Sequence, residues 1–146
     1  MKKNTQVLVI GGGVTGAGAL RDLALRGVDC ILVERGDMAA GASGANHGLL
    51  HSGGRYLVND RQSAAECLAE GRILKRVASH CIEDTGGTFV SLPGDPEDYA
   101  EQFLATATEL GLPAKTVAVN ELRDEEPYLS PEVHTAIRVE DASINP

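Results

Sequence analysis

The N-terminal part of the chain has two short apolar runs separated by a helical pattern. Residues 7–10 and 30–33 are the unbroken apolar runs. Over residues 14–26, apolar side chains recur at helical spacing, charged residues lie off that stripe, and Gly27 follows as a stop signal. Runs without a polar face are typical of parallel strands, so the pattern predicts a β-α-β unit with a right-handed crossover.

The later part of the chain predicts shorter elements of both kinds. A helix is expected over residues 62–80, with Cys67, Leu74 and Cys81 on one buried stripe and Leu68 and Val77 beside them. A second helix is expected to start with Asp95 as N-cap and Pro96 at the first helical position. It ends at Gly111, and its expected apolar face consists of Tyr99, Phe103, Ala107 and Leu110. Strands are expected over 88–92, 115–119 and 134–139, and a short helix over 121–126.

Residues 36–55 have little regular pattern and are rich in Gly, Ala and Ser. A flexible linker is one interpretation of this composition. The segment also contains Asn46, two histidines, two leucines and the pair Arg55-Tyr56, which is unusual for an inert spacer. We therefore expect it to line a ligand.

Composition narrows the class of protein. The chain has 146 residues, 42% of them hydrophobic, and this suits one globular domain. A net charge of -8 argues against nucleic acid or an anionic membrane surface as the main partner. No apolar run near the N-terminus is long enough for a signal peptide or a membrane span, which favours a cytoplasmic protein. The three cysteines form no C-x-x-C motif, and we expect them to be core thiols, not disulfides or metal ligands.

Gly11, Gly13 and Gly16 form a G-x-G-x-x-G fingerprint between the first apolar run and the first helix. In a dinucleotide site, these glycines permit a tight turn, close approach of the pyrophosphate and close packing of the helix. The N–H groups around Val14 and Thr15 would face the anion. Glu34 ends the second strand, where it would accept from a ribose hydroxyl and repel a 2′-phosphate, which disfavours NADP.

The fingerprint alone does not distinguish an NAD-binding domain from an FAD-binding domain. After Glu34 the chain does not proceed directly to another helix but inserts the glycine-rich stretch. That stretch is long enough to run beside an extended cofactor, so FAD is favoured.

A resemblance adds to these patterns. The sequence of residues 41–56, GASGANHGLLHSGGRY, with residues 7–18 and 31–35, resembles the N-terminal part of FAD-dependent glycerol-3-phosphate dehydrogenases. The His-Gly-Leu-Leu-His-Ser-Gly motif is closer to the large catalytic polypeptide (type A) of the anaerobic enzymes than to the aerobic ones. Similarity continues through residues 73–76 and 141–146, so it covers nearly the whole chain.

The resemblance implies hydride transfer from C2 of sn-glycerol 3-phosphate to N5 of FAD, which yields dihydroxyacetone phosphate. Electrons would pass to a quinone through membrane-anchoring and electron-transfer subunits, possible partners that would hold the protein at the inner membrane. The implied pyrophosphate contacts are Gly11, Gly13, Val14, Thr15, Gly16 and Ser43. Glu34 would bind the ribose and Arg35 the adenine side. The implied flavin-ring residues are His47, Gly48, Leu49 and Leu50.

The implied substrate residues are Arg55, facing the phosphate, and Tyr56 beside it. Arginine suits this role because its guanidinium binds phosphate in a bidentate manner, although a surface arginine is the alternative. Removing hydride from an alcohol also needs a base, and His51 is the candidate. Packing or hydrogen bonding beside the flavin is the alternative for this histidine. A metal pair of His47 and His51 is rejected, because the glycines around them disfavour a helix and no carboxylate lies in this segment of the sequence.

The expected fold is α/β, of the glutathione-reductase-like and D-amino-acid-oxidase-like type. Residues 1–85 would form the start of a Rossmann-like FAD-binding domain, and residues 86–146 the start of a substrate-side α+β sheet. A doubly wound domain needs a third parallel strand, and none follows Glu34, so the chain is expected to be the first portion of a longer flavoenzyme. Two alternatives stay open: a flavin oxidoreductase acting on a 2-hydroxy acid or amino acid, and a non-catalytic FAD-domain remnant.

Overall fold

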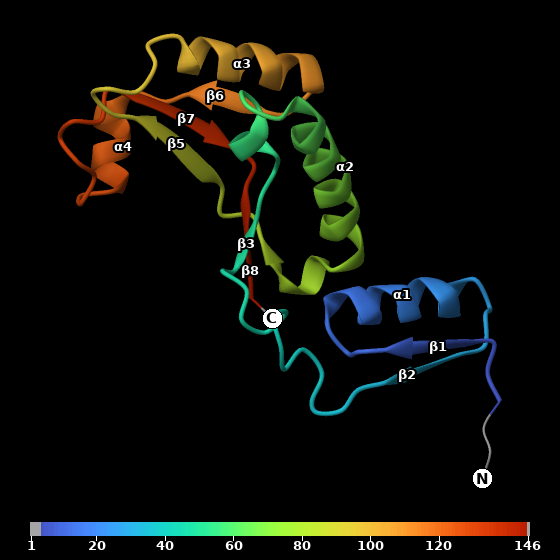
Figure 1. Ribbon diagram of the computed structural model, residues 1–146. Coiled ribbons are helices and arrows are strands. Elements are labelled where there is room, and N and C mark those ends of the chain that lie inside the picture. The colour runs from blue at the N-terminus through green and yellow to red at the C-terminus, as the bar shows by residue number, and fades with distance from the viewer. Residues whose placement is uncertain (1–3, 146) are drawn as a thin grey trace. The chain divides into compact units, whose positions relative to one another are not determined.

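The computed structural model describes residues 4–145, which form two units, the first ending at His47 and the second beginning at Gly48. The first unit contains β1 (Val7–Ile10), α1 (Val14–Leu25) and β2 (Cys30–Val33) (Figure 1). The two strands are parallel and in register from Val7 opposite Cys30 to Ile10 opposite Val33. The predicted β-α-β unit is confirmed, with the helix ending at Leu25 and Gly27 at φ +74° just after it.

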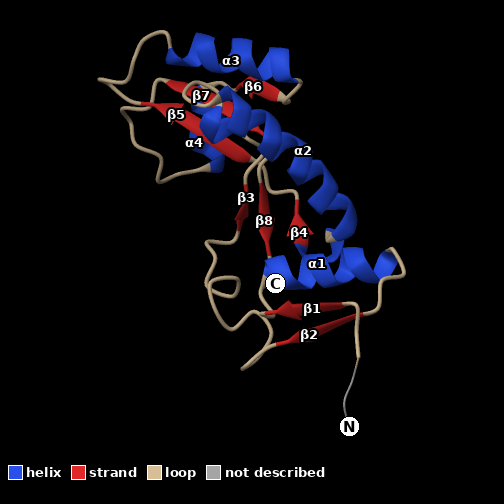
Figure 2. Cartoon of the chain, turned by 45° about the vertical axis from the view of Figure 1, so that its right-hand side comes forward, coloured by secondary structure: helices blue, strands red, loops and turns tan. Residues whose placement is uncertain are grey.

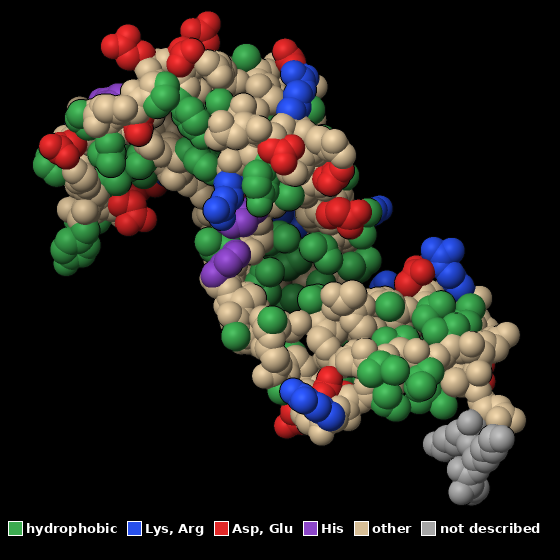
Figure 3. Space-filling model, viewed as in Figure 1, with side chains coloured by type: hydrophobic (Ala, Val, Ile, Leu, Met, Phe, Trp, Pro, Cys, Tyr) green, Lys and Arg blue, Asp and Glu red, His purple; other side chains and the backbone are tan. Residues whose placement is uncertain are grey.

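One face of this small sheet packs against α1, and the other face is exposed. Val9 lies against α1 at Gly16. Leu8, Ile10 and Val33 share the other face, and their exposed fractions are 53%, 81% and 44%. Figure 3 shows exposed hydrophobic side chains on this unit. Among residues 4–145, no third strand pairs with β1 or β2.

The second unit has its core between an antiparallel sheet and two helices. The sheet order is β5 (Gly87–Ser91), β7 (Thr135–Val139), β6 (Ala114–Thr116), and the helices are α2 (Arg61–Val77) and α3 (Tyr99–Leu110). The core residues are Leu57, Ala64, Leu68, Phe103, Ala107, Leu112, Ile137 and Val139. None of the helices within residues 4–145 combines the length and apolar character needed to cross a bilayer.

A second small sheet links distant parts of this unit. It has the order β3 (Leu49–Leu50), β8 (Ala142–Ile144), β4 (Ile82–Glu83), and all pairs are antiparallel (Figure 2). The sequence does not predict β8, because its three residues are too few to show an alternating pattern. Its extended conformation comes from pairing with strands on both sides. Two single-turn 3-10 helices, Gly54–Tyr56 and Ser79–Cys81, flank α2.

The predicted start of α3 is wrong. The helix begins at Tyr99 with Asp98 as its N-cap, and the Asp95 carboxylate instead accepts a 2.8 Å hydrogen bond from the Leu92 N–H. Asp95 therefore closes a turn before the helix. The predicted apolar face is right at its centre, where Phe103 and Ala107 are buried, and Gly111 ends the helix at φ +68°.

The predicted buried stripe of α2 is right only at Leu68. Its buried residues are Ala64, Leu68 and Gly71, whereas Leu74 is 38% exposed and Cys67 only half-buried. The helix turns its smallest residues inward because backbone of another segment approaches it closely. Two further boundaries differ from the prediction. The strand predicted over 115–119 is β6, which ends at Thr116. The short helix predicted over 121–126 is α4 (Val119–Glu125), which begins two residues earlier.

Candidate functional site

The turn after β1 favours glycine for a backbone reason at Gly11 and for a steric reason at Gly16. Gly11 has φ +107°, a backbone conformation that favours glycine. A Cβ on Gly16 would lie 1.9 Å from the carbonyl oxygen of Gly11. The N-terminus of α1 is therefore held directly against the turn, so its N–H groups are placed where an anion can approach them.

The segment after β2 folds back over this turn. The Ala39 N–H donates to the Gly12 carbonyl at 2.9 Å, and the Val14 N–H donates to the Ser43 hydroxyl at 2.8 Å. A Cβ on Gly13 would lie 3.0 Å from that hydroxyl oxygen. Ser43 therefore lies at the N-terminus of α1, where it adds a hydroxyl to the backbone donors of Thr15 and Gly16.

Glu34 is held at the same turn. Its Oε2 accepts from the Gly12 N–H at 2.6 Å, and its Oε1 accepts from the Gly36 N–H at 3.0 Å. These two bonds, the Gly12 bond first, hold the pKa of the carboxyl below its usual value, so the group is ionised at neutral pH. Each oxygen keeps a further lone pair that can accept from a ribose hydroxyl. A pocket of about 410 Å³ lies here, and it is lined by Ile10, Gly11, Val33, Glu34 and Arg35.

In the second unit, a buried Ser-Gly-Gly segment separates two of the candidate substrate residues. Gly53 has φ +106°, and a Cβ there would lie 2.5 Å from the Ala64 carbonyl oxygen on α2. A Cβ on Gly54 would lie 2.8 Å from the Phe89 ring. This close packing fixes the backbone on which His51 and Arg55 stand.

Arg55 lies in the 3-10 helix Gly54–Tyr56 and is exposed. Within residues 4–145 its guanidinium forms no ion pair. Tyr56 is half-buried and packs against the core. The arginine is therefore open to an anion, and the tyrosine is anchored beside it.

Sequence reasoning assigned no role to Asp141, which holds both His51 and Ser52. Its Oδ1 accepts from the Ser52 N–H at 2.7 Å and from the Ser52 hydroxyl at 2.6 Å. Its Oδ2 lies 3.2 Å from Nδ1 of His51. The available signal was a pair of acidic residues, Glu140 and Asp141, directly after the predicted strand 134–139, but nothing in the sequence shows that Leu49–Leu50 pairs beside Asp141.

The predicted flavin-ring residues occupy an extended stretch. Gly48 has φ +72°, and its carbonyl accepts from the Ile144 N–H at 2.8 Å. Leu49, 48% exposed, and Leu50 form β3 at the edge of the small sheet. His47 is exposed at the end of the first unit. Their roles toward a flavin stay predictions.

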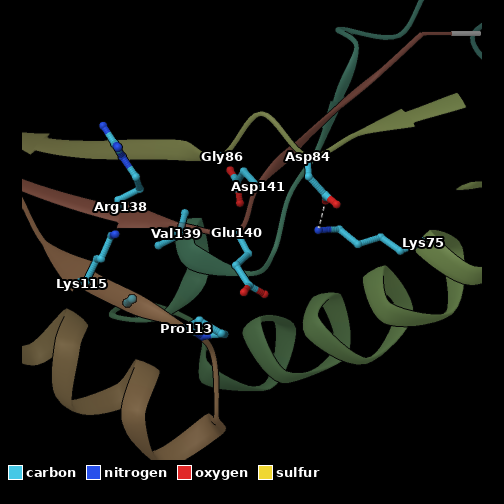
Figure 4. A pocket seen from close by; sticks show the side chains of 10 residues that line it. Lys75, Asp84, Gly86, Pro113, Lys115, Arg138, Val139, Glu140 and Asp141 are labelled. Carbon is cyan, nitrogen blue, oxygen red and sulfur yellow. Dashed lines mark hydrogen bonds and ion pairs between the residues drawn. The ribbon is translucent and has the colours of Figure 1, made fainter. Parts of the chain in front are cut away.

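A cavity of about 710 Å³ in the second unit has a lining of mixed charge, shown in Figure 4. Lys75 is paired with Asp84 at 2.6 Å, and Arg138 is paired with Glu125 at 2.5 Å. Because these cations are already neutralised, the cavity is not a uniform anion site. Asp141 lies on its wall.

Comparison with known proteins identifies the class. The family model described as DAO, FAD dependent oxidoreductase, matches residues 6–146. The A1 polypeptide of the anaerobic glycerol-3-phosphate dehydrogenase of Haloferax volcanii is 51% identical over 100% of this chain, which covers 25% of that relative. The corresponding A polypeptide of the Haemophilus influenzae enzyme is 50% identical over 98% of this chain and 25% of its own length. The chain thus spans about a quarter of these relatives, and the predicted resemblance is confirmed.

Solved structures confirm the α/β fold. L-proline dehydrogenase from P. horikoshii matches 99% of this chain and 39% of its own, with a TM-score of 0.82 and 19% identity. L-alpha-glycerophosphate oxidase from Mycoplasma pneumoniae, solved with FAD bound, matches 99% of this chain and 40% of its own, with a TM-score of 0.80 and 20% identity. From its sequence and its fold together, the chain belongs to the DAO family of FAD-dependent oxidoreductases, whose cofactor is FAD.

Proposed function

We propose that this protein oxidises sn-glycerol 3-phosphate to dihydroxyacetone phosphate with FAD as the hydride acceptor. The observation that carries the proposal is the identity of about half of all residues, over the whole chain, to polypeptides of anaerobic glycerol-3-phosphate dehydrogenases. The geometry of both units supports it, because each provides the groups that one half of the reaction requires.

The first unit suits the nucleotide end of FAD. Backbone donors at Gly13, Thr15 and Gly16, with the Ser43 hydroxyl, bind the pyrophosphate at the N-terminus of α1. The Gly11 N–H is already donated to the Val33 carbonyl at 2.9 Å, so Gly11 contributes through the turn that it permits. Glu34 accepts from the ribose with its remaining lone pairs, and Arg35 lies on the adenine side. The Val14 N–H is already donated to Ser43, so Val14 contributes through that serine. When bound, FAD supplies the two-electron acceptor for the reaction.

The second unit suits the substrate. Arg55 binds the phosphate through its guanidinium, with Tyr56 beside it. His51 takes the proton from the C2 hydroxyl. The hydrogen on C2 leaves as hydride, with the electron pair of the C–H bond, to the FAD acceptor, and the C2–O bond becomes a carbonyl. Residues His47 to Leu50 line the flavin ring. This assignment uses every candidate residue on the segment 47–56.

The proposal extends to the electron acceptor. The relatives are named as single subunits of their enzymes, which supports partner subunits for this protein. We place a quinone as the final acceptor, reached through these partners, with the assembly held at the inner membrane. Co-purification of further subunits, and quinone reduction that depends on them, test this part.

Product analysis with the protein expressed from its full coding sequence tests the reaction. The FAD-loaded enzyme is given an artificial electron acceptor and, in separate assays, sn-glycerol 3-phosphate, its mirror image sn-glycerol 1-phosphate, a 2-hydroxy acid or an amino acid. We expect dihydroxyacetone phosphate from the first substrate and little turnover of the others. Turnover of only a hydroxy acid or an amino acid would contradict the proposal, and no turnover of any substrate would favour a non-catalytic remnant.

A further inference from the structure

We infer that Asp141 is the positioning residue for His51, which it holds with Nδ1–H toward the carboxylate so that the lone pair resides on Nε2. This inference rests on the proposed function, in which His51 removes the hydroxyl proton. It adds a residue from the far end of the chain to the chemistry of segment 47–56.

The hydrogen bonds of Asp141 leave one oxygen for the histidine. Both donors of Ser52, its N–H and its hydroxyl, bond to Oδ1 at 2.7 and 2.6 Å. The carboxylate cannot rotate without losing these two bonds. Its Oδ2 is thereby fixed 3.2 Å from Nδ1 of His51.

The packing around Asp141 fits a carboxylate that stays fixed. The side chain is only 13% exposed. A Cβ on Gly87 would lie 2.9 Å from Cβ of Asp141 and 3.2 Å from its Oδ2. Gly87 is opposite Val139 in the β5–β7 pairing. Because Gly87 has no side chain, the Asp141 side chain can pack directly against the backbone of β5. The close-up in Figure 4 shows Asp141 beside the adjoining Gly86.

The chemistry of the pair determines the tautomer. An ionised carboxylate only accepts hydrogen bonds, so Nδ1 must carry the hydrogen, and neutral imidazole then has its lone pair on Nε2. When His51 gains the substrate proton, the same carboxylate stabilises the imidazolium.

Other charged groups near His51 are already engaged or lack this direct contact. A small cavity of about 40 Å³ brings Arg72, Lys75 and Glu140 to the neighbourhood of His51. Lys75 is paired with Asp84, and Arg72 donates to the Gly111 carbonyl. Among residues 4–145, Asp141 is the carboxylate within hydrogen-bond distance of the ring.

Replacing Asp141 with Asn in the FAD-loaded protein, expressed from its full coding sequence, tests the inference. The amide oxygen can still accept from Ser52, while the amide NH2 donates to Nδ1 and forces the hydrogen onto Nε2. We expect kcat with sn-glycerol 3-phosphate to fall about 100-fold or more. KM and FAD affinity should change by less than about threefold, because neither contact is lost. Asp124→Asn removes the same charge at an exposed position on α4 and should leave all three values unchanged.

A double-mutant cycle separates positioning from a merely structural role. On a His51→Gln background, Asp141→Asn should lower kcat no further, since the residue it positions is gone. An equal loss on both backgrounds, or full activity of His51→Gln, would overturn the inference. If Asp141→Asn does not fold, Ser52→Ala replaces it in the same cycle: it removes one of the two hydrogen bonds that hold the carboxylate and should lower kcat only when His51 is present. A wild-type enzyme inactive on sn-glycerol 3-phosphate would instead contradict the proposed function itself.

Discussion

A single steric contact makes glycine necessary at position 16. A Cβ there would lie 1.9 Å from the Gly11 carbonyl oxygen, so Gly16→Ala must push α1 away from the turn. We expect this substitution to destabilise the protein by about 1–3 kcal/mol and to weaken FAD binding strongly. Urea unfolding and FAD release on dilution measure the two effects.

Gly18 provides the matched control on the same helix. A Cβ at this position meets nothing within 4 Å. Gly18→Ala should keep FAD and stabilise the helix by up to about 1 kcal/mol. If the two alanine variants behave alike, the close packing of α1 on the turn is not what the site requires.

Glu34 gives the nucleotide turn a dependence on pH. Because hydrogen bonds from Gly12 and Gly36 lower its pKa in the folded state, its stabilising contribution is complete above 4.5, the ordinary glutamate pKa, and is lost as pH falls through the lower folded value. Glu34→Gln should therefore lower Tm at pH 7, and its difference from wild type should shrink at low pH. Glu97→Gln, at an exposed position, should show no such trend. A difference independent of pH would refute the effect.

Arg55 is the residue expected to determine affinity for the substrate phosphate. Its exposed guanidinium forms no ion pair within residues 4–145, so Arg55→Ala removes a charge-assisted contact without freeing a buried carboxylate. We expect binding of sn-glycerol 3-phosphate to weaken by about 2–4 kcal/mol, seen as a higher KM. Arg76→Ala on α2 is the control for loss of one positive charge. An unchanged KM for Arg55→Ala would remove this residue from the site.

At the scale of elements, sequence predicted best where a pattern is local. The strands at 7–10 and 30–33 have apolar residues on both faces, and the three consecutive glycines after the first strand, residues 11–13, indicate a turn. On α2, hydrophobicity predicts the burial of Leu68 but not that of Ala64 and Gly71, which are buried for their small size. The strand β8 depends on partners far away in sequence, as does the contact of Asp141 with His51. The motif residues of the site could thus be named from sequence, but the residue that holds the histidine could not.

Helix capping offers a test of the element boundaries. The Asp60 carboxylate accepts from the Ser63 N–H at 3.0 Å and caps α2, whereas Asp98 at the start of α3 makes no side-chain capping bond. Asp60→Ala should destabilise the protein by about 0.5–2 kcal/mol, and Asp98→Ala by less. Urea unfolding of both variants measures the difference. Equal effects, or a larger one for Asp98→Ala, would contradict the assigned caps.

On the scale of the whole molecule, the two units divide the chemistry between them. The first carries the nucleotide turn with Glu34 and Ser43, and the second carries His51, Arg55 and Asp141. The chain spans about a quarter of its dehydrogenase relatives, so the reaction is a proposal for the whole protein. In that proposal the two units supply groups for both the cofactor and the substrate, which favours an enzyme over a module that only binds flavin.

Anaerobic titration of the FAD-loaded protein, expressed from its full coding sequence, with sn-glycerol 3-phosphate tests this reaction without any added acceptor. Transfer of the C2 hydride to FAD predicts loss of the oxidised-flavin absorbance with about one equivalent of substrate per flavin, together with dihydroxyacetone phosphate in the same amount. Flavin that stays oxidised with this substrate but is bleached by a 2-hydroxy acid or an amino acid would contradict the proposed reaction.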